Sequence, residues 1–147
     1  MENMNNIENK SIVVARELSK IYGSNESKVI ALDTVNLTIS KGEIVAIFGP
    51  SGSGKTTLLN LLAGLDVPTS GQVFIDNQEI TKMNEEEKTR FRAKNMGFIF
   101  QFFNLIPVLN AVENVELPLL LNGVPISESR KRALELLEKV NMANRKD

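Results

Sequence analysis

The sequence contains no cysteine and no histidine in 147 residues, and only 5% of its residues are aromatic. The absence of cysteine excludes disulfides and thiolate nucleophiles, and together with the absence of histidine it excludes a Cys/His zinc site and an imidazole general base. A lack of cysteine is also compatible with a reducing compartment. The remaining composition, 42% hydrophobic and 24% charged, is that of an ordinary globular chain of one domain.

Positive and negative charges are nearly balanced, with 17 Lys and Arg residues against 18 Asp and Glu residues. We expect no nucleic-acid partner, since such proteins usually carry a strongly basic surface. The longest apolar runs, residues 44–48 and 117–121, are far shorter than the roughly 20 residues that span a bilayer. Residues 1–10 are polar and resemble no secretion signal, which predicts a cytoplasmic protein with a polar tail before a domain over residues 11–147.

Hydrophobic periodicity predicts two kinds of strand. Alternating or β-branched residues favour half-buried strands over residues 12–18, 35–39 and 73–75. Continuous apolar runs over residues 44–48 and 96–100 favour strands that are buried on both faces of a parallel sheet.

Four segments have helical patterns. Residues 57–63 are leucine-rich, and Gly64 can end that helix in the left-handed conformation. Asn84 can cap a second helix that ends near Lys94. The other two helices are expected over residues 111–117, where Pro118 interrupts the pattern, and over residues 127–140, where Ala133, Leu137 and Val140 share a face and Asn141 follows the end.

Residues 49–56 match the pattern G-x-x-x-x-G-K-[ST]. Glycines let backbone N–H groups wrap closely around a triphosphate, and the helix that follows adds free donors and a positive dipole end. A glycine-rich turn could match by chance, but the strand before it and the helix after it favour phosphate binding. The residues expected to bind the nucleotide are Gly49, Pro50, Ser51, Gly52, Ser53, Gly54, Lys55, Thr56 and Thr57, with Lys55 on the β- and γ-phosphates and the Thr56 hydroxyl on Mg²⁺.

With this loop, two further segments make the chain resemble the ATP-binding subunit of ABC transporters from about residue 12 to its end. Residues 18–23 resemble the A-loop of that family, in which an aromatic residue, here Tyr22, stacks on adenine. Residues 97–107 resemble the Q-loop, whose glutamine, here Gln101, helps to hold Mg²⁺ and the attacking water. Without the resemblance, Tyr22 could be a packed strand-end residue and Gln101 a surface residue.

The resemblance implies an α/β fold, a P-loop NTPase (RecA-like) core with an antiparallel β part at the N-terminus and the start of a helical subdomain. Residues 58–66 and 113–121 look most like the branch that releases lipoproteins or exports macrolides and antimicrobial peptides. That branch moves amphiphilic cargo through separate membrane subunits. ATP and Mg²⁺ are thus the implied cofactors, and the implied partners are a second nucleotide-binding subunit and a permease.

The permease is expected to dock on residues 102–120 and to hold the subunit at the inner face of the plasma membrane. Taken without the resemblance, the apolar residues of that segment would simply be core; they are Phe102, Phe103, Leu105 and Leu109.

Three features of the family do not occur in this sequence: the Leu-Ser-Gly-Gly-Gln signature loop, a strand that ends in Asp-Glu, and a switch histidine. We therefore expect an N-terminal part of the domain, truncated before the signature loop, with exposed apolar surface and doubtful self-pairing. Only the phosphate loop, Thr56 and Gln101 remain for phosphoryl transfer, which also needs a positioned nucleophile and charge compensation. The chain should therefore bind Mg-ATP but hydrolyse it negligibly on its own.

Two other interpretations remain open. The first is a non-hydrolytic module that binds ATP weakly or occupies the docking groove of the membrane partner. The second is another P-loop enzyme, such as a small-molecule kinase or a GTPase. A kinase would need a lid with several basic residues, and the candidates are Arg90, Arg92 and Lys94; a solvated helix face is the simpler interpretation of these residues. A GTPase would need an Asn-Lys-x-Asp motif to read guanine, and the sequence has none.

Overall fold

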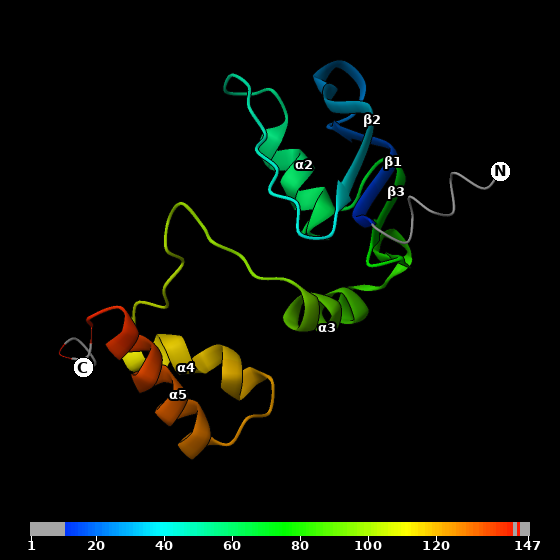
Figure 1. Ribbon diagram of the computed structural model, residues 1–147. Coiled ribbons are helices and arrows are strands. Elements are labelled where there is room, and N and C mark those ends of the chain that lie inside the picture. Colours follow the sequence, from blue (N-terminus) through cyan, green and yellow to red (C-terminus); the bar gives the residue numbers. More distant parts are fainter. Residues whose placement is uncertain (1–10, 143, 145–147) are drawn as a thin grey trace. The chain divides into compact units, whose positions relative to one another are not determined.

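The computed structural model describes residues 11–142 and residue 144, so the polar tail predicted for residues 1–10 lies outside it. The chain forms two compact units, Met1–Met96 and Gly97–Asp147 (Figure 1). The first unit contains β1 (Ser11–Tyr22), η1 (Asn25–Ser27), β2 (Val29–Ser40), α2 (Lys55–Leu62), β3 (Ser70–Ile75), β4 (Gln78–Glu79), η2 (Ile80–Lys82) and α3 (Glu85–Asn95). The second contains α4 (Ala111–Leu121) and α5 (Ile126–Lys139).

The first unit is built on an antiparallel sheet with the strand order β2-β1-β3-β4. β1 pairs with two strands, since Ala15 lies opposite Leu37 of β2 and opposite Val73 of β3. The strands predicted over residues 12–18, 35–39 and 73–75 are therefore confirmed. Each is longer than predicted, because pairing with a neighbour extends a strand through polar residues that the hydrophobic pattern does not mark.

The core of this unit joins the sheet to α2. Leu18 of β1, Val73 of β3 and Leu61 of α2 belong to one cluster, and none of them is more than 1% exposed. The helix predicted over residues 57–63 is confirmed and begins two residues earlier, at Lys55. It ends as predicted at Gly64, which has a φ of 63° and donates its N–H to the Leu61 carbonyl at 3.1 Å.

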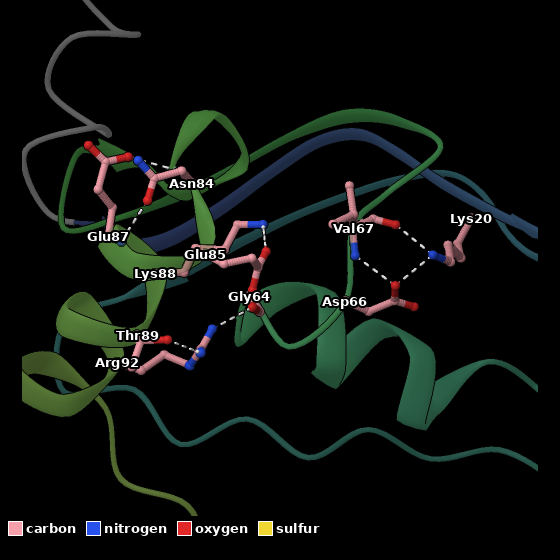
Figure 2. Close-up of polar contacts among 10 residues, drawn as sticks. All are labelled: Lys20, Gly64, Asp66, Val67, Asn84, Glu85, Glu87, Lys88, Thr89 and Arg92. Carbon is pink, nitrogen blue, oxygen red and sulfur yellow. Dashed lines mark hydrogen bonds and ion pairs between the residues drawn. The ribbon is translucent and has the colours of Figure 1, made fainter.

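α3 begins with the cap that the sequence predicts at Asn84. The Asn84 side chain accepts the N–H of Glu87 at 3.0 Å, and the Glu87 carboxylate accepts the N–H of Asn84 at 2.8 Å. From the same helix, the Arg92 guanidinium donates to the carbonyl oxygen of Gly64 at 2.7 Å (Figure 2). This contact joins α3 to the end of α2, where unpaired carbonyls carry partial negative charge.

In the second unit, α4 and α5 pack through Val112, Ala133 and Leu137. The prediction that Pro118 interrupts the first of these helices is wrong, because α4 continues through Pro118 to Leu121. A proline removes one backbone donor but leaves its carbonyl free to accept. The N–H of Asn122 donates to the Pro118 carbonyl at 3.3 Å and to the Leu119 carbonyl at 3.1 Å, which completes the last turn.

α5 confirms the amphipathic helix predicted over residues 127–140, and Ala133 and Leu137 are buried. Val140 does not share their environment as predicted, since it is 62% exposed. The reason is that the helix ends at Lys139 and the chain turns at Asn141, whose φ of 59° is the left-handed conformation expected there. No helix in the described part of the chain has the length and apolarity needed to cross a bilayer.

Two of the predicted strands do not form. Residues 44–48 and 96–100 have no regular secondary structure. A strand in a parallel sheet needs hydrogen-bonded neighbours, and the sheet of the described residues includes neither segment. Apolar residues of both segments are exposed to solvent: Ile44 is 97%, Phe48 is 90% and Ile99 is 102% exposed. The expected exposure of apolar surface is therefore confirmed, and the strands themselves are corrected to irregular chain.

The contact between Arg92 and Gly64 predicts a difference between two arginines of α3. Replacing Arg92 with methionine removes a charge-assisted hydrogen bond to a helix end, and we expect a loss of about 1.5–3 kcal/mol in the free energy of unfolding. Arg90 forms an exposed ion pair with Glu86 on the same helix, so Arg90→Met should cost less than about 0.5 kcal/mol. Urea denaturation followed by circular dichroism measures both, and equal losses would contradict the role given to Arg92.

Candidate functional site

Residues 49–54 form a tight loop between the irregular segment 44–48 and α2. The N–H of Ser53 donates to the carbonyl of Pro50 at 3.3 Å. Gly52 and Gly54 have φ values of 80° and 86°, which side chains with a Cβ rarely adopt. At Gly54 there is also no space, because an added Cβ would lie 2.4 Å from the carbonyl oxygen of Ala31. The loop backbone therefore passes directly against β2.

The side chain of Lys55 folds back over this loop. Its Nζ donates to the carbonyl oxygens of Gly49 at 2.8 Å and Pro50 at 2.7 Å, and it lies 3.4 Å from the Ser53 Oγ. The ammonium group is thus held by loop carbonyls at the start of the helix. An anion bound in the loop would therefore lie close to this positive charge.

A pocket of about 250 Å³ opens beside the loop and is lined by residues 51–57 and by Val29, Ile30 and Ala31 of β2. The first turn of α2 forms part of this lining, so backbone N–H groups without intrahelical partners and the positive end of the helix dipole face it. Thr56 and Thr57, which carry hydroxyl groups, also line the pocket. Backbone donors, hydroxyls and one ammonium group make an arrangement that suits a phosphate.

The predicted metal ligands lie in different units. Thr56 lines the pocket of the first unit, whereas the exposed Gln101 belongs to the second unit. In the described ranges, no group of three or more acidic residues could hold a metal ion by itself. Mg²⁺ prefers oxygen ligands and commonly shares them with substrate phosphates, so the Thr56 hydroxyl fits a site completed by a bound triphosphate. The roles of Thr56 and Gln101 toward Mg²⁺ stay predictions.

Tyr22 lies at the end of β1 and pairs with Val29, which lines the pocket. Its hydroxyl donates to the Oδ2 of Asp66 at 2.8 Å. The Nζ of Lys20 lies 4.8 Å from the centre of the Tyr22 ring. It also donates to the Oδ1 of Asp66 at 2.7 Å and to the carbonyl of Val67 at 2.6 Å (Figure 2). These contacts hold the only tyrosine of the chain at the end of the strand.

Asp66 is the acceptor at the centre of this cluster. Burial raises the pKa of its carboxyl group, but hydrogen bonds from Lys20, Tyr22 and the N–H of Val67 outweigh that effect, and the pKa lies below its ordinary value. The carboxylate is therefore ionised at neutral pH, which suits its pairing with the Lys20 ammonium.

Sequence reasoning did not identify Lys20 or Asp66. A signal for Lys20 exists, because residues two apart on a strand point to the same face and Lys20 precedes Tyr22 by two. No comparable local signal exists for Asp66, which lies 44 residues from Tyr22 and just beyond the end of α2.

Comparison with known proteins identifies the family of this chain. The ABC transporter family model matches residues 32–147. An uncharacterised ABC transporter ATP-binding protein of Methanocaldococcus jannaschii is 51% identical over 134 residues, which are 91% of this chain and 60% of that protein. The lipoprotein-releasing system ATP-binding protein LolD of Pseudoalteromonas translucida is 44% identical over 137 residues, which are 93% of this chain and 59% of LolD. The chain thus spans about 60% of the length of these curated relatives.

A solved structure of an ATP-binding cassette has a similar fold. The dimeric structure of the ATP-binding cassette MJ0796, bound to ADP and Pi in a post-hydrolysis state, matches with a TM-score of 0.79 and 48% identity. The match covers 86% of this chain and 56% of that one. The expected fold class, an α/β P-loop cassette with an antiparallel β part, is confirmed, while residues 44–48 and 96–100 of this chain remain irregular.

Two glycines of the loop provide a matched pair for testing its geometry. Alanine at Gly52 or at Gly54 must adopt a left-handed conformation, which costs about 1–2 kcal/mol at either position. An added Cβ meets nothing within 4 Å at Gly52, but at Gly54 it also meets the Ala31 carbonyl and lies 3.0 Å from a Leu32 methyl carbon. We expect Gly54→Ala to lower the free energy of unfolding clearly more than Gly52→Ala in urea titrations. Indistinguishable losses would show that the loop does not press against β2.

Proposed function

Because the chain belongs to the ABC transporter family, as an ATP-binding subunit of that family, we propose that it binds Mg-ATP through residues 49–57. The observation that carries this proposal is the position of Lys55 Nζ, held by two loop carbonyls at the start of α2 beside a pocket of about 250 Å³. When a triphosphate enters the loop, the ammonium group can exchange carbonyl oxygens for the β- and γ-phosphate oxygens. The left-handed glycines let the backbone N–H groups approach the same ligand closely.

Other residues would complete the nucleotide site. The Thr56 hydroxyl would ligate the Mg²⁺ that accompanies ATP, and that ion would neutralise charge on the phosphates. Tyr22 would stack on the adenine, a contact worth about 1–3 kcal/mol in nucleic-acid complexes. Gln101, a side chain with both an acceptor and donors, would help to hold Mg²⁺ and water.

We further propose that the subunit powers export or extraction of an amphiphilic substrate through separate membrane subunits. The likeness to LolD, named for a lipoprotein-releasing system, supports this branch. A permease would dock on the 102–120 segment, where Phe102, Phe103 and Val108 are 78%, 85% and 88% exposed. Such docking would place the subunit on the inner face of the plasma membrane. The dimeric state of the MJ0796 structures supports a second nucleotide-binding subunit as the other partner.

A polypeptide of residues 1–147 should nevertheless hydrolyse ATP negligibly when tested alone. Phosphoryl transfer to water needs a positioned nucleophile and compensation of the developing charge. This sequence offers the loop, Thr56 and Gln101 for that task, and it has no histidine. A non-hydrolytic ATP-binding or interaction module is the alternative function, and it shares the binding site but not the coupling to transport.

Lys55→Met tests nucleotide binding directly. We expect the wild-type chain to bind Mg-ATP saturably in isothermal titration calorimetry and the variant to bind at least about tenfold more weakly, because a charge-assisted contact to phosphate is lost. Lys82→Met is the matched control, since Lys82 is 74% exposed and pairs with Glu79 away from the loop.

A phosphate-release assay on the same samples tests the expected lack of hydrolysis. We expect release at the level of buffer with Mg-ATP present. Mg²⁺-dependent turnover that Lys55→Met abolishes would contradict that expectation, and equal ATP binding by the wild-type chain and Lys55→Met would contradict the binding site itself.

A further inference from the structure

The Tyr22 side chain is held at two points by residues that are also bound to each other. Asp66 accepts the Tyr22 hydroxyl at 2.8 Å with one carboxylate oxygen and the Lys20 ammonium at 2.7 Å with the other. The same ammonium lies 4.8 Å from the centre of the Tyr22 ring, within the range of a cation–π contact. The three side chains therefore form a closed set of contacts, in which the carboxylate fixes the ring edge and the ammonium lies over the ring.

Burial within this set is uneven. Lys20 and Asp66 are half-buried, while Tyr22 is exposed. The two residues that hold the Tyr22 side chain are thus more buried than Tyr22. Because Tyr22 is 41% exposed, part of this residue remains accessible to a ligand.

Asp66 is placed independently of Tyr22. The segment that follows α2 is bound to β1 by its backbone, because the N–H of Thr69 donates to the Ser19 carbonyl at 2.9 Å. The Thr69 hydroxyl also accepts the N–H of Ile21 at 2.9 Å. Loss of the Asp66 carboxylate would free the Tyr22 hydroxyl, the Lys20 ammonium and the Val67 N–H. The two Thr69 bonds should still hold this segment against β1.

We infer that Lys20 and Asp66 are positioning residues that hold the Tyr22 ring in one orientation, with one face covered and the other available to the base of a nucleoside triphosphate. This inference rests on the proposed nucleotide-binding function. A free tyrosine side chain would occupy several rotamers and lose that freedom when a base stacks on it. A ring that is already fixed avoids that loss, which corresponds to about two- to tenfold in affinity.

The test compares Mg-ATP, which has a base, with inorganic tripolyphosphate, which has none, by calorimetry on the 147-residue chain. We expect Tyr22→Ala to weaken ATP binding at least about fivefold, the lower end of base stacking on an aromatic side chain. Asp66→Asn and Lys20→Met should each weaken it about two- to tenfold. All three variants should bind tripolyphosphate within about twofold of the wild-type chain, because the phosphate loop is unchanged.

Two controls separate positioning of the ring from general support of the fold. In the Tyr22→Ala background, Asp66→Asn should cause no further loss of ATP affinity, because there is no ring left to hold. Asp76→Asn, which breaks the exposed pair with Lys41 in the same unit, should change neither ligand. Thermal unfolding of each variant verifies that it remains folded.

Several outcomes would overturn the inference. Equal loss of ATP and tripolyphosphate affinity in Asp66→Asn, or the same ATP loss with and without Tyr22, would show that the pair supports the fold rather than the ring. Unchanged ATP affinity in both Asp66→Asn and Lys20→Met would also overturn it. If the wild-type chain binds tripolyphosphate and Tyr22→Ala leaves ATP binding intact, stacking on Tyr22 is wrong and the inference falls with it. If the wild-type chain binds neither ligand, the phosphate site itself is wrong.

Discussion

The close approach of the Gly54 backbone to the carbonyl of Ala31 is the constraint on which the first unit depends. It fixes where α2 begins relative to β2, because no side chain fits between them. The other end of α2 is held by the turn at Gly64 and by the guanidinium of Arg92. A helix of only 8 residues is thus attached to its surroundings at both ends. Since an isolated helix of this length is unstable in water, these attachments and the buried leucines account for its presence.

Both parts of the candidate site follow from this attachment. The phosphate loop lies before the first residue of α2, and Asp66 lies just beyond its end. Because β1 runs beside β2 and ends at Tyr22, the aromatic residue and the carboxylate meet on the same unit as the loop. The sheet and one short helix therefore place a cradle for an anion and a fixed ring within a single compact unit.

Much of this arrangement was predictable from the sequence because it is encoded locally. The cap at Asn84, the stop at Gly64 and the run of glycines in the loop each depend on residues within a few positions of one another. Contacts that join distant positions were not predictable in that way. Asp66 lies 46 residues from Lys20, and nothing in either neighbourhood marks the pair.

The failed predictions have a related cause. The apolar runs at residues 44–48 and 96–100 have the composition of buried strands, but composition supplies no hydrogen-bonding partner. In the same way, the pattern at residues 111–117 signals a break at Pro118, whereas the helix continues through it. Local sequence therefore indicates only a preference for each segment, and the neighbours available in space decide whether that preference is satisfied.

The contacts of Lys55 have a consequence for how the loop exists before it meets any anion. Carbonyl oxygens that converge repel one another, and a loop of this shape would tend to open if nothing neutralised them. Here the ammonium group serves as a tethered counter-ion, supplied by the first residue of the helix rather than by the solvent. A mobile salt ion would be lost on dilution, whereas a covalently attached one stays at the same local concentration. The loop thereby keeps its curvature without a bound salt ion and remains shaped to receive an anion.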